Sequence, residues 1–286
     1  MLSWLADFWR DRTGRFAPLK AAAWVLACYP PVLIAVRFLA GDLGGRPINE
    51  ATLVTGDWTI HFFLLSLAIT PARALLDLPK LIPLRRIFGV AAACLIGLHL
   101  LLYCLDQKWN LWTVGSEIVL RFYLTIGVVA LLGLGVLAIT STDAWQRRLR
   151  HRWKLLHRLV WPIGVLALWH YFLQSKINVV NPTFYTGLFY WLVFWRLLPR
   201  RWQAKFAALL PIALLAEIAT AATEAAWYGL ATRLDPWRVL AANLDVRFGL
   251  RPAEQVLVAT LAIAAIVPLR RRWRQRGSLR RLSMVK

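Results

Sequence analysis

The chain has 286 residues, of which 59% are hydrophobic, with a mean hydropathy of +0.54 and a formal net charge of +21. Apolar stretches of about 20 residues, the length that crosses a bilayer core, recur along the whole sequence. The segments between them reach at most about two dozen residues, which is too short for a separate soluble domain. The composition therefore indicates a membrane protein and excludes a nucleotide-binding domain within this chain.

The pattern predicts an all-α, polytopic membrane helix bundle. In chain order we expect a cytoplasmic or interfacial segment at 1–20, in which the charges of Met1–Phe16 do not fit a removable signal peptide. A six-span core at 21–202 and a two-span extension with a basic tail at 203–286 then follow, separated by the charged segment 196–205. The eight expected spans are 21–40, 58–76, 87–105, 118–140, 155–172, 183–199, 206–228 and 253–269.

Positive charge predicts the orientation of the spans. With the N-terminus in the cytoplasm, the inner segments carry 25 Lys or Arg residues and the outer segments carry 7. We therefore expect both termini on the cytoplasmic side. The basic tail from residue 270 directly follows a span, so we interpret it as a topology signal that contacts anionic lipid and expect no nucleic acid partner.

Two histidines lie at the same depth in different predicted spans. His99 is seven residues before Asp106 and His170 is six residues before Lys176, which places both about 9–10 Å below the outer end of their helices. An imidazole inside a bilayer is costly, and it is a good axial ligand for haem iron. We therefore predict a haem between His99 and His170, and hydrogen bonding across the bundle is the alternative. The small residues that leave room for a flat macrocycle are Gly97, Gly127, Gly133 and Gly135.

Two further histidines leave the number of haems open. His157 lies near the inner end of its span, about 140° around an ideal helix from His170, unless Pro162 and Gly164 bend the segment. A second haem on His157 and a solvated interfacial histidine are both consistent with this position. His61 lies near the outer end of the second span, as a polar group beside the outer haem or a spare ligand. The sequence has no Cys-x-x-Cys-His motif, which excludes covalently attached haem.

Other side chains are candidate contacts because of their predicted depth. Arg121 and Lys176 are candidate partners of the haem propionates, although snorkelling at a span end explains them as well. Three tyrosines near the outer haem are candidate hydrogen-bonding groups or members of the interfacial aromatic belt: Tyr103, Tyr123 and Tyr171.

Charged groups elsewhere have a functional and a plainer interpretation. Arg73, Arg85 and Arg86 cluster at the inner face, where a quinone or a flavin phosphate could dock, yet the positive-inside rule alone accounts for them. Glu217 and Glu224 lie seven residues apart on one face of the seventh span. They are candidates for a proton path or for hydrogen bonds to a neighbouring helix.

A series of motifs runs in order across about residues 55–200. Its segments are Trp58–His61, Ile69–Arg73, Leu84–Gly89, His99–Tyr103, Arg121–Gly127, Ala138–Ser141, Trp153–Val160, His170–Tyr171 and Ser175–Lys176. This series resembles the MsrQ (YedZ) family, within the ferric-reductase-like transmembrane domains shared with NADPH oxidases. The resemblance implies a six-helix core in which the haem ligands carry over to His99, His157 and His170. Oxidase relatives have an earlier histidine where this chain has Arg85 or Arg86, and the compact members lack the spans after residue 200.

The same resemblance implies a function. It implies a haem b carrier in the bacterial inner membrane that takes electrons from quinol, with flavin mononucleotide (FMN) as a further cofactor. The electrons would pass to a periplasmic molybdopterin enzyme that reduces methionine sulfoxide in proteins, so the catalytic subunit is a separate chain. One alternative is another ferric-reductase-like or cytochrome b carrier. A different class, a polytopic transporter, would need broken helices and polar groups at the midplane.

Overall fold

The structure, a computed structural model, describes residues 9–10, 14–245, 247 and 249–283. Within this part of the chain all regular secondary structure is helical, and the β pairing is a single isolated bridge between Arg10 and Phe16. The predicted all-α class is confirmed. Of the interfacial segment expected at 1–20, residues 1–8 and 11–13 lie outside the described residues. The first long helix begins at Pro18.

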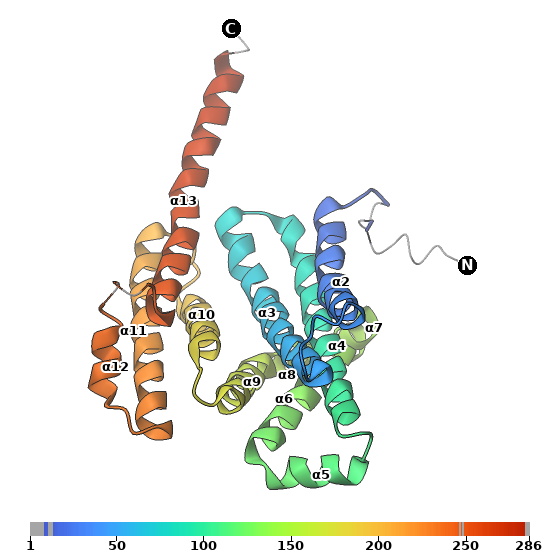
Figure 1. Cartoon of the computed structure of the whole chain (residues 1–286). Coiled ribbons are helices and arrows are strands. Elements are labelled where there is room, and N and C mark those ends of the chain that lie inside the picture. The colour runs from blue at the N-terminus through green and yellow to red at the C-terminus, as the bar shows by residue number, and fades with distance from the viewer. Residues whose placement is uncertain (1–8, 11–13, 246, 248, 284–286) are drawn as a thin grey trace. The chain divides into compact units, whose positions relative to one another are not determined.

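The helices form two compact units, which are described separately below (Figure 1). The first unit comprises Met1–Ile69 and Lys80–Gln174, and the second comprises Thr70–Pro79 and Ser175–Lys286. This division differs from the module boundary expected at 202, because the helix Val180–Leu197 packs with the extension. Whether 21–202 acts as a functional module remains a prediction.

The first unit contains the four candidate histidines, most of α3 and all the helices that follow it up to α9. Its helices are α2 (Pro18–Leu39), α3 (Pro47–Leu76), α4 (Ile82–Asp106), α5 (Leu111–Leu120), α6 (Phe122–Ile139), α7 (Asp143–Leu149), α8 (His151–Leu156) and α9 (Val160–Ser175), with 3-10 turns at Pro79–Leu81 and His157–Leu159. Fully buried apolar side chains such as Phe62, Leu67 and Ala92 form its core.

Helix α3 is 30 residues long and begins at Pro47, not near residue 58 as the hydropathy pattern predicts. Polar residues in its first turns suggest a loop, but their hydroxyls are satisfied inside the helix. Thr52 donates to the carbonyl oxygen of Ile48 at 2.8 Å, and Thr59 donates to that of Thr55 at 2.8 Å. As a consequence His61 lies well inside α3, about 20 Å from its first residue, and not near the outer end of the helix.

The span expected at 118–140 is interrupted at Arg121, which has an extended backbone with φ −103° and ψ 100°. The residues before it form α5, whose first turn is capped by the Asn110 side chain accepting from the Thr113 amide at 3.1 Å. Figure 1 shows α5 running across the direction of α6 instead of continuing it. The expected outer loop at 106–117 is therefore largely helical.

The second unit is built around three closely packed helices. They are α10 (Val180–Leu197), α11 (Phe206–Ala231) and α13 (Pro252–Ser283). The short α12 (Pro236–Ala242) lies in the connection between α11 and α13. At Gly187 of α10 an added Cβ would overlap Thr220 of α11 and Val256 of α13, so only glycine permits this close approach of three helices. Arg270 of α13 binds Asp77 at 2.7 Å and the Leu75 carbonyl at 2.9 Å, which ties the end of α3 to this unit.

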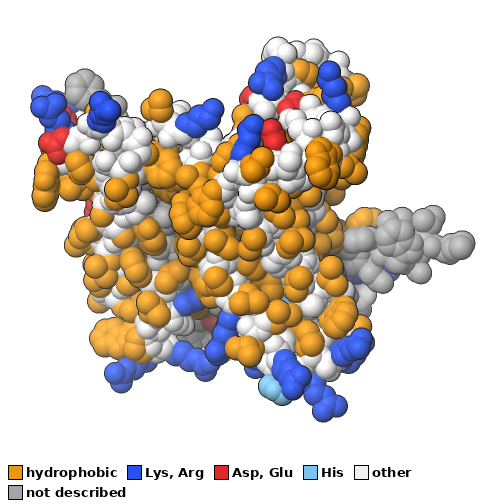
Figure 2. Space-filling model, turned by 90° about the horizontal axis from the view of Figure 1, so that it is seen from below, with side chains coloured by type: hydrophobic (Ala, Val, Ile, Leu, Met, Phe, Trp, Pro, Cys, Tyr) orange, Lys and Arg blue, Asp and Glu red, His pale blue; other side chains and the backbone are white. Residues whose placement is uncertain are grey.

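Six helices of the described chain are long and apolar enough to cross a membrane, by length and composition. They are Pro18–Leu39, Pro47–Leu76, Pro79–Asp106, Phe122–Ile139, Phe206–Ala231 and Pro252–Arg270. The expected spans at 155–172 and 183–199 are also helical, as α9 with 16 residues and the more polar α10 with 18, so their crossing remains a prediction. Figure 2 shows hydrophobic side chains over much of the visible surface, as lipid contact requires. The chain is a multi-pass membrane protein.

Glu224 and Glu217, which the sequence places on one face of α11, have different surroundings. Glu224 is 1% exposed, and its two oxygens accept from Arg251 Nη2 at 2.6 Å and Asn243 Nδ2 at 2.9 Å. Glu254 accepts from the Arg251 amide at 2.7 Å. This polar cluster fastens the connection between α11 and α13, whereas Glu217 is only half-buried. The structure therefore favours the plainer interpretation of Glu224.

We expect Glu224→Gln to lower the free energy of unfolding by about 2 kcal/mol, because the partly buried Arg251 loses its counter-charge. Unfolding of the purified protein in detergent, followed by tryptophan fluorescence or circular dichroism, measures this loss. Glu217→Gln is the matched control on the same helix face and should change stability by less than about 0.5 kcal/mol. Equal losses in the two variants would contradict the assignment of Glu224 as the structural partner of Arg251.

Candidate haem-binding site

His99 of α4 is held by the first turns of α3. Its Nδ1 lies 2.8 Å from the carbonyl oxygen of Thr52 and 3.5 Å from the Thr55 hydroxyl. A carbonyl oxygen can only accept, so this ring nitrogen carries the hydrogen and the lone pair is on Nε2. A metal-ligating histidine normally donates its other N–H in this way. The half-buried His99 thus has the tautomer that an axial ligand needs.

His170 of α9 is held in the same manner by α6. Its Nδ1 lies 2.7 Å from the carbonyl oxygen of Tyr123, so Nε2 again carries the lone pair. The two imidazoles are close enough to interact electrostatically. The structure therefore brings together, in one compact unit, the two histidines for which the sequence predicts equal depth, and gives both the same tautomer.

Two glycines lie close to the two rings. A Cβ added at Gly56 of α3 would lie 3.3 Å from Cε1 and Nδ1 of His99, and one added at Gly127 of α6 would lie 2.8 Å from the same atoms of His170. Gly127 therefore makes room for the ligand ring itself, while an added Cβ at Gly97 or Gly135 meets nothing within 4 Å. Two fixed imidazoles with available Nε2 lone pairs fit bis-histidine haem ligation.

His157 lies in the 3-10 turn that separates α8 from α9. Its Nδ1 donates to the Trp153 carbonyl at 3.1 Å, and the Trp153 ring stacks on it with centroids 3.9 Å apart. Its Nε2 lies 3.4 Å from Ser141 Oγ, but that hydroxyl donates its hydrogen to the Leu137 carbonyl at 2.6 Å. The His157 ring also has a hydrogen bond to the Leu137 carbonyl, so the structure assigns no unengaged lone pair to its Nε2 atom. The helix changes to a 3-10 turn at 157–159, before Pro162 and Gly164, the residues at which a bend could occur.

His61 points back along its own helix. Its Nδ1 donates to the carbonyl oxygen of Asp57 at 2.7 Å, and its ring lies 5.1 Å from that of Trp58 between centroids. Tyr171, the residue after His170, donates its hydroxyl to the Asp57 carboxylate. The sequence does not single out Asp57, because the predicted span begins at residue 58 and leaves Asp57 in the outer loop. In the structure α3 begins at Pro47, so Asp57 lies inside a membrane-spanning helix, where a carboxylate is a candidate functional group.

A second polar network joins α4, α5 and α6. Tyr103 donates to the Glu117 carboxylate, which also binds Arg121 at 2.8 Å, and Arg121 donates to the Tyr123 hydroxyl at 3.2 Å. The Tyr123 hydroxyl and the Glu117 carboxylate raise the pKa of Arg121 above its usual value. Glu117, which the sequence places in an outer loop, is thus the residue that links two of the predicted contacts.

The remaining predicted contacts are dispersed. Arg85 is close enough to His157 to interact electrostatically, and Arg86 forms an ion pair with Asp143 at 2.8 Å. Arg73 and Lys176 are exposed residues of the second compact unit, and the Lys176 carbonyl accepts from Trp227 at 3.2 Å. The proposed cofactor contacts of these four residues remain predictions.

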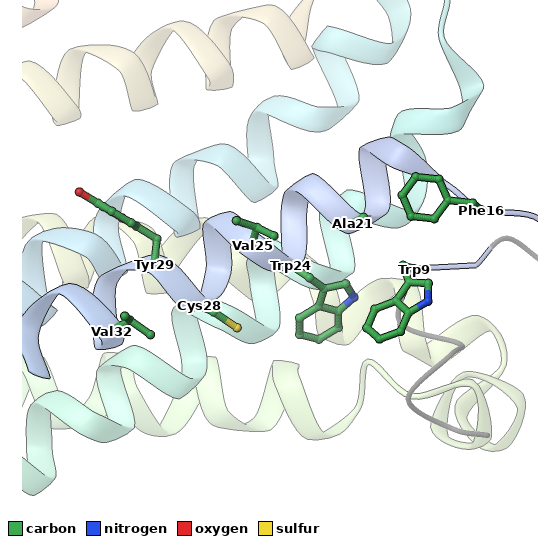
Figure 3. A pocket seen from close by; sticks show the side chains of 8 residues that line it. All are labelled: Trp9, Phe16, Ala21, Trp24, Val25, Cys28, Tyr29 and Val32. Carbon is green, nitrogen blue, oxygen red and sulfur yellow. The ribbon is translucent and has the colours of Figure 1, made fainter. Parts of the chain in front are cut away.

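An apolar groove of about 630 Å³ follows α2 and the segment before it (Figure 3). Its side chains are aromatic or aliphatic apart from one thiol and one phenol, and no predicted haem ligand is among them. It therefore adds no ligand to the histidine site. The lining residues are Trp9, Phe16, Ala21, Trp24, Val25, Cys28, Tyr29 and Val32.

Known proteins resemble this chain over the part that carries the histidines. The sequence model of the family described as "Ferric reductase like transmembrane component" matches residues 55–168. A protein of Rhodospirillum rubrum named "Protein-methionine-sulfoxide reductase heme-binding subunit MsrQ" is 42% identical over 192 residues, which is 66% of this chain and 90% of that protein. The chain belongs to the MsrQ family.

Other proteins with the same name are similar to this chain to a comparable degree. The Caulobacter vibrioides protein is 38% identical over 189 residues, covering 64% of this chain and 87% of that protein. The Xanthomonas campestris protein is 40% identical over 171 residues, covering 58% of this chain and 78% of that protein. The matched residues 55–168 contain His61, His99 and His157 and end two residues before His170. No solved structure matches the chain.

We expect Gly127→Ala to weaken haem binding by about 10-fold, the scale of losses on disturbing groups that orient a metal ligand. The new Cβ would lie 2.8 Å from the His170 ring, so the imidazole must move from its position against the Tyr123 carbonyl. Titration of the purified apoprotein with haem, followed by absorbance, measures the affinity. Gly135→Ala, on the same helix with open space beside it, is the matched control. Unchanged affinity in Gly127→Ala would show that the ring position is not critical.

Proposed function

We propose that this chain is a membrane-embedded haem b electron carrier that takes electrons from quinol and passes them to a periplasmic reductase of methionine sulfoxide in proteins. The observation that carries the proposal is the pair His99 and His170, each with Nδ1–H donated to a backbone carbonyl and Nε2 left for a metal. The name of the related proteins, heme-binding subunit of a protein-methionine-sulfoxide reductase, supports the proposal.

The proposed role of His99 and His170 is to hold one haem that transfers electrons and does not bind oxygen. A haem held by His99 and His170 would supply one-electron transfer in preference to oxygen binding. The carbonyls of Thr52 and Tyr123 hold the two imidazoles, and Gly56 and Gly127 leave room for the rings. The charged Arg121 is the proposed partner of a propionate.

A second, inner haem on His157 is proposed from the same logic. Its Nδ1–H is donated to the Trp153 carbonyl, and iron at Nε2 would replace the 3.4 Å contact with Ser141 and the hydrogen bond of the ring to the Leu137 carbonyl. An inner redox centre would shorten the distance that electrons travel across the bilayer. Arg85 and Arg86, near this side of the unit, are the proposed contacts for quinol or for FMN, in line with the positive charge of the inner segments.

The partner and the location follow from the family and from the proposed orientation. With both termini in the cytoplasm of a bacterium, the His99 and His170 pair faces the periplasmic side of the inner membrane. The electron acceptor is then a separate periplasmic molybdopterin enzyme, and this chain is its electron-transfer subunit. The family model ends at residue 168, so the proposal assigns no role to the extension.

Substitution of the proposed ligands tests the proposal directly. We expect His99→Ala and His170→Ala each to abolish most of the α-band of the reduced outer haem, because one remaining imidazole holds a porphyrin weakly. Difference spectra and the pyridine haemochrome of purified protein give the band and the haem content. His157→Ala should spare the outer haem. His151 is an exposed histidine of α8, so His151→Ala should keep the full haem content. A normal spectrum and haem content in both ligand variants would refute the site.

The electron donor is tested with quinol analogues. The basic inner face and the absence of a dinucleotide fingerprint from the sequence favour a membrane quinol over NADPH as the donor. We expect menaquinol or ubiquinol analogues to reduce the haem of the detergent-solubilised protein without an added reductase, as followed by stopped-flow absorbance. Fast reduction by NADPH alone, together with no response to quinol, would contradict this choice of donor.

A further inference from the structure

One short segment of α3 is in contact with both ligand-bearing helices. Thr52 accepts from Nδ1 of His99 at 2.8 Å, and Gly56 leaves the space in which the His99 ring lies. The next residue, Asp57, accepts a hydrogen bond from the hydroxyl of Tyr171 in α9. Tyr171 directly follows His170 in the chain. One and a half turns of α3, residues 52–57, therefore contact His99 itself and the neighbour of His170.

Both the side-chain carboxylate and the backbone carbonyl of Asp57 accept hydrogen bonds. Its carboxylate receives the Tyr171 hydroxyl, and its backbone carbonyl receives Nδ1–H of His61 at 2.7 Å. A hydrogen bond from a phenol to a carboxylate is stronger than one between neutral groups, and low local polarity strengthens it further. The half-buried pair can therefore hold α9 against α3 in a defined register.

We infer that Asp57 and Tyr171 are positioning residues that set the separation and the relative ring orientation of His99 and His170. The inference rests on the proposed function, since it concerns the ligands of the proposed haem. His170 is already tied to α6 through the Tyr123 carbonyl, and this bond fixes the ring relative to α6. The bond between Asp57 and Tyr171 adds the connection to α3, the helix that holds the opposite ligand.

The test uses the full-length purified protein and separates the hydrogen bond from the charge of Asp57. Tyr171→Phe and Asp57→Ala each remove the bond, whereas in Asp57→Asn the amide oxygen can still accept from the hydroxyl. Tyr190→Phe is the matched control, because it deletes a tyrosine hydroxyl that bonds Thr223 at 3.0 Å in the other compact unit. The g-values of the ferric haem report ring orientation, and transfer of haem to apomyoglobin reports its rate of loss.

We expect Tyr171→Phe and Asp57→Ala to keep the haem at saturation, with displaced g-values and about 10-fold faster haem loss. The double variant should be no worse than either single one, because both remove the same bond. Asp57→Asn, whose neutral amide oxygen accepts a weaker bond, should lie between the wild-type protein and Asp57→Ala, and Tyr190→Phe should resemble the wild-type protein. If either bond-removing variant fails to insert, the other one provides the same test.

Two results would overturn the inference. In the first, Tyr171→Phe and Asp57→Ala match the wild-type g-values and rate of haem loss. In the second, Asp57→Asn is displaced as far as Asp57→Ala while Tyr171→Phe is not, which would assign the effect to charge. Wild-type protein that binds no haem would refute the proposed function instead, so the two failures are distinguishable.

Discussion

Two hydrogen bonds, from the Nδ1–H groups of His99 and His170 to main-chain carbonyl oxygens, are the constraint on which the rest of the proposed site depends. An imidazole among apolar helices must donate its N–H, and donation to a carbonyl settles which nitrogen keeps the lone pair. Because the acceptors belong to α3 and α6, the two ligand rings are fixed by helices other than their own. The glycines at 56 and 127 suit this arrangement, since an added Cβ would overlap the His170 ring at 127 and crowd the His99 ring at 56.

The class of fold could be predicted from the sequence because it depends on simple periodic geometry, and the same geometry predicts the pairing of His99 with His170. A rise of about 1.5 Å per residue, measured from charged span ends, is enough to match the depths of two histidines. The start of α3 could not be predicted in this way. Thr52, Thr55 and Asp57 suggest a loop by hydropathy, and only their partners in the folded bundle show why they are helical.

The break at Arg121 and the role of Glu117 escape the sequence for a similar reason. A hydropathy window merges residues 118–140 into one apolar stretch, and it cannot show that a carboxylate in the preceding segment binds both Tyr103 and Arg121. In the second compact unit, the partners of Glu224 are Asn243 and Arg251, which lie in a segment that appears from the sequence to be an outer loop. Spacing along α11 finds the two glutamates but cannot tell the buried one from the half-buried one.

The central claim is that His99 and His170 ligate one haem through their Nε2 atoms. An experimental density map of the haem-loaded protein in detergent or nanodiscs tests it most directly. The account predicts a planar macrocycle between α4 and α9, with the iron bonded to both Nε2 atoms and both Nδ1–H groups still donated to Thr52 and Tyr123. A macrocycle ligated by other residues, or histidine rings turned so that Nδ1 faces the iron, would contradict it.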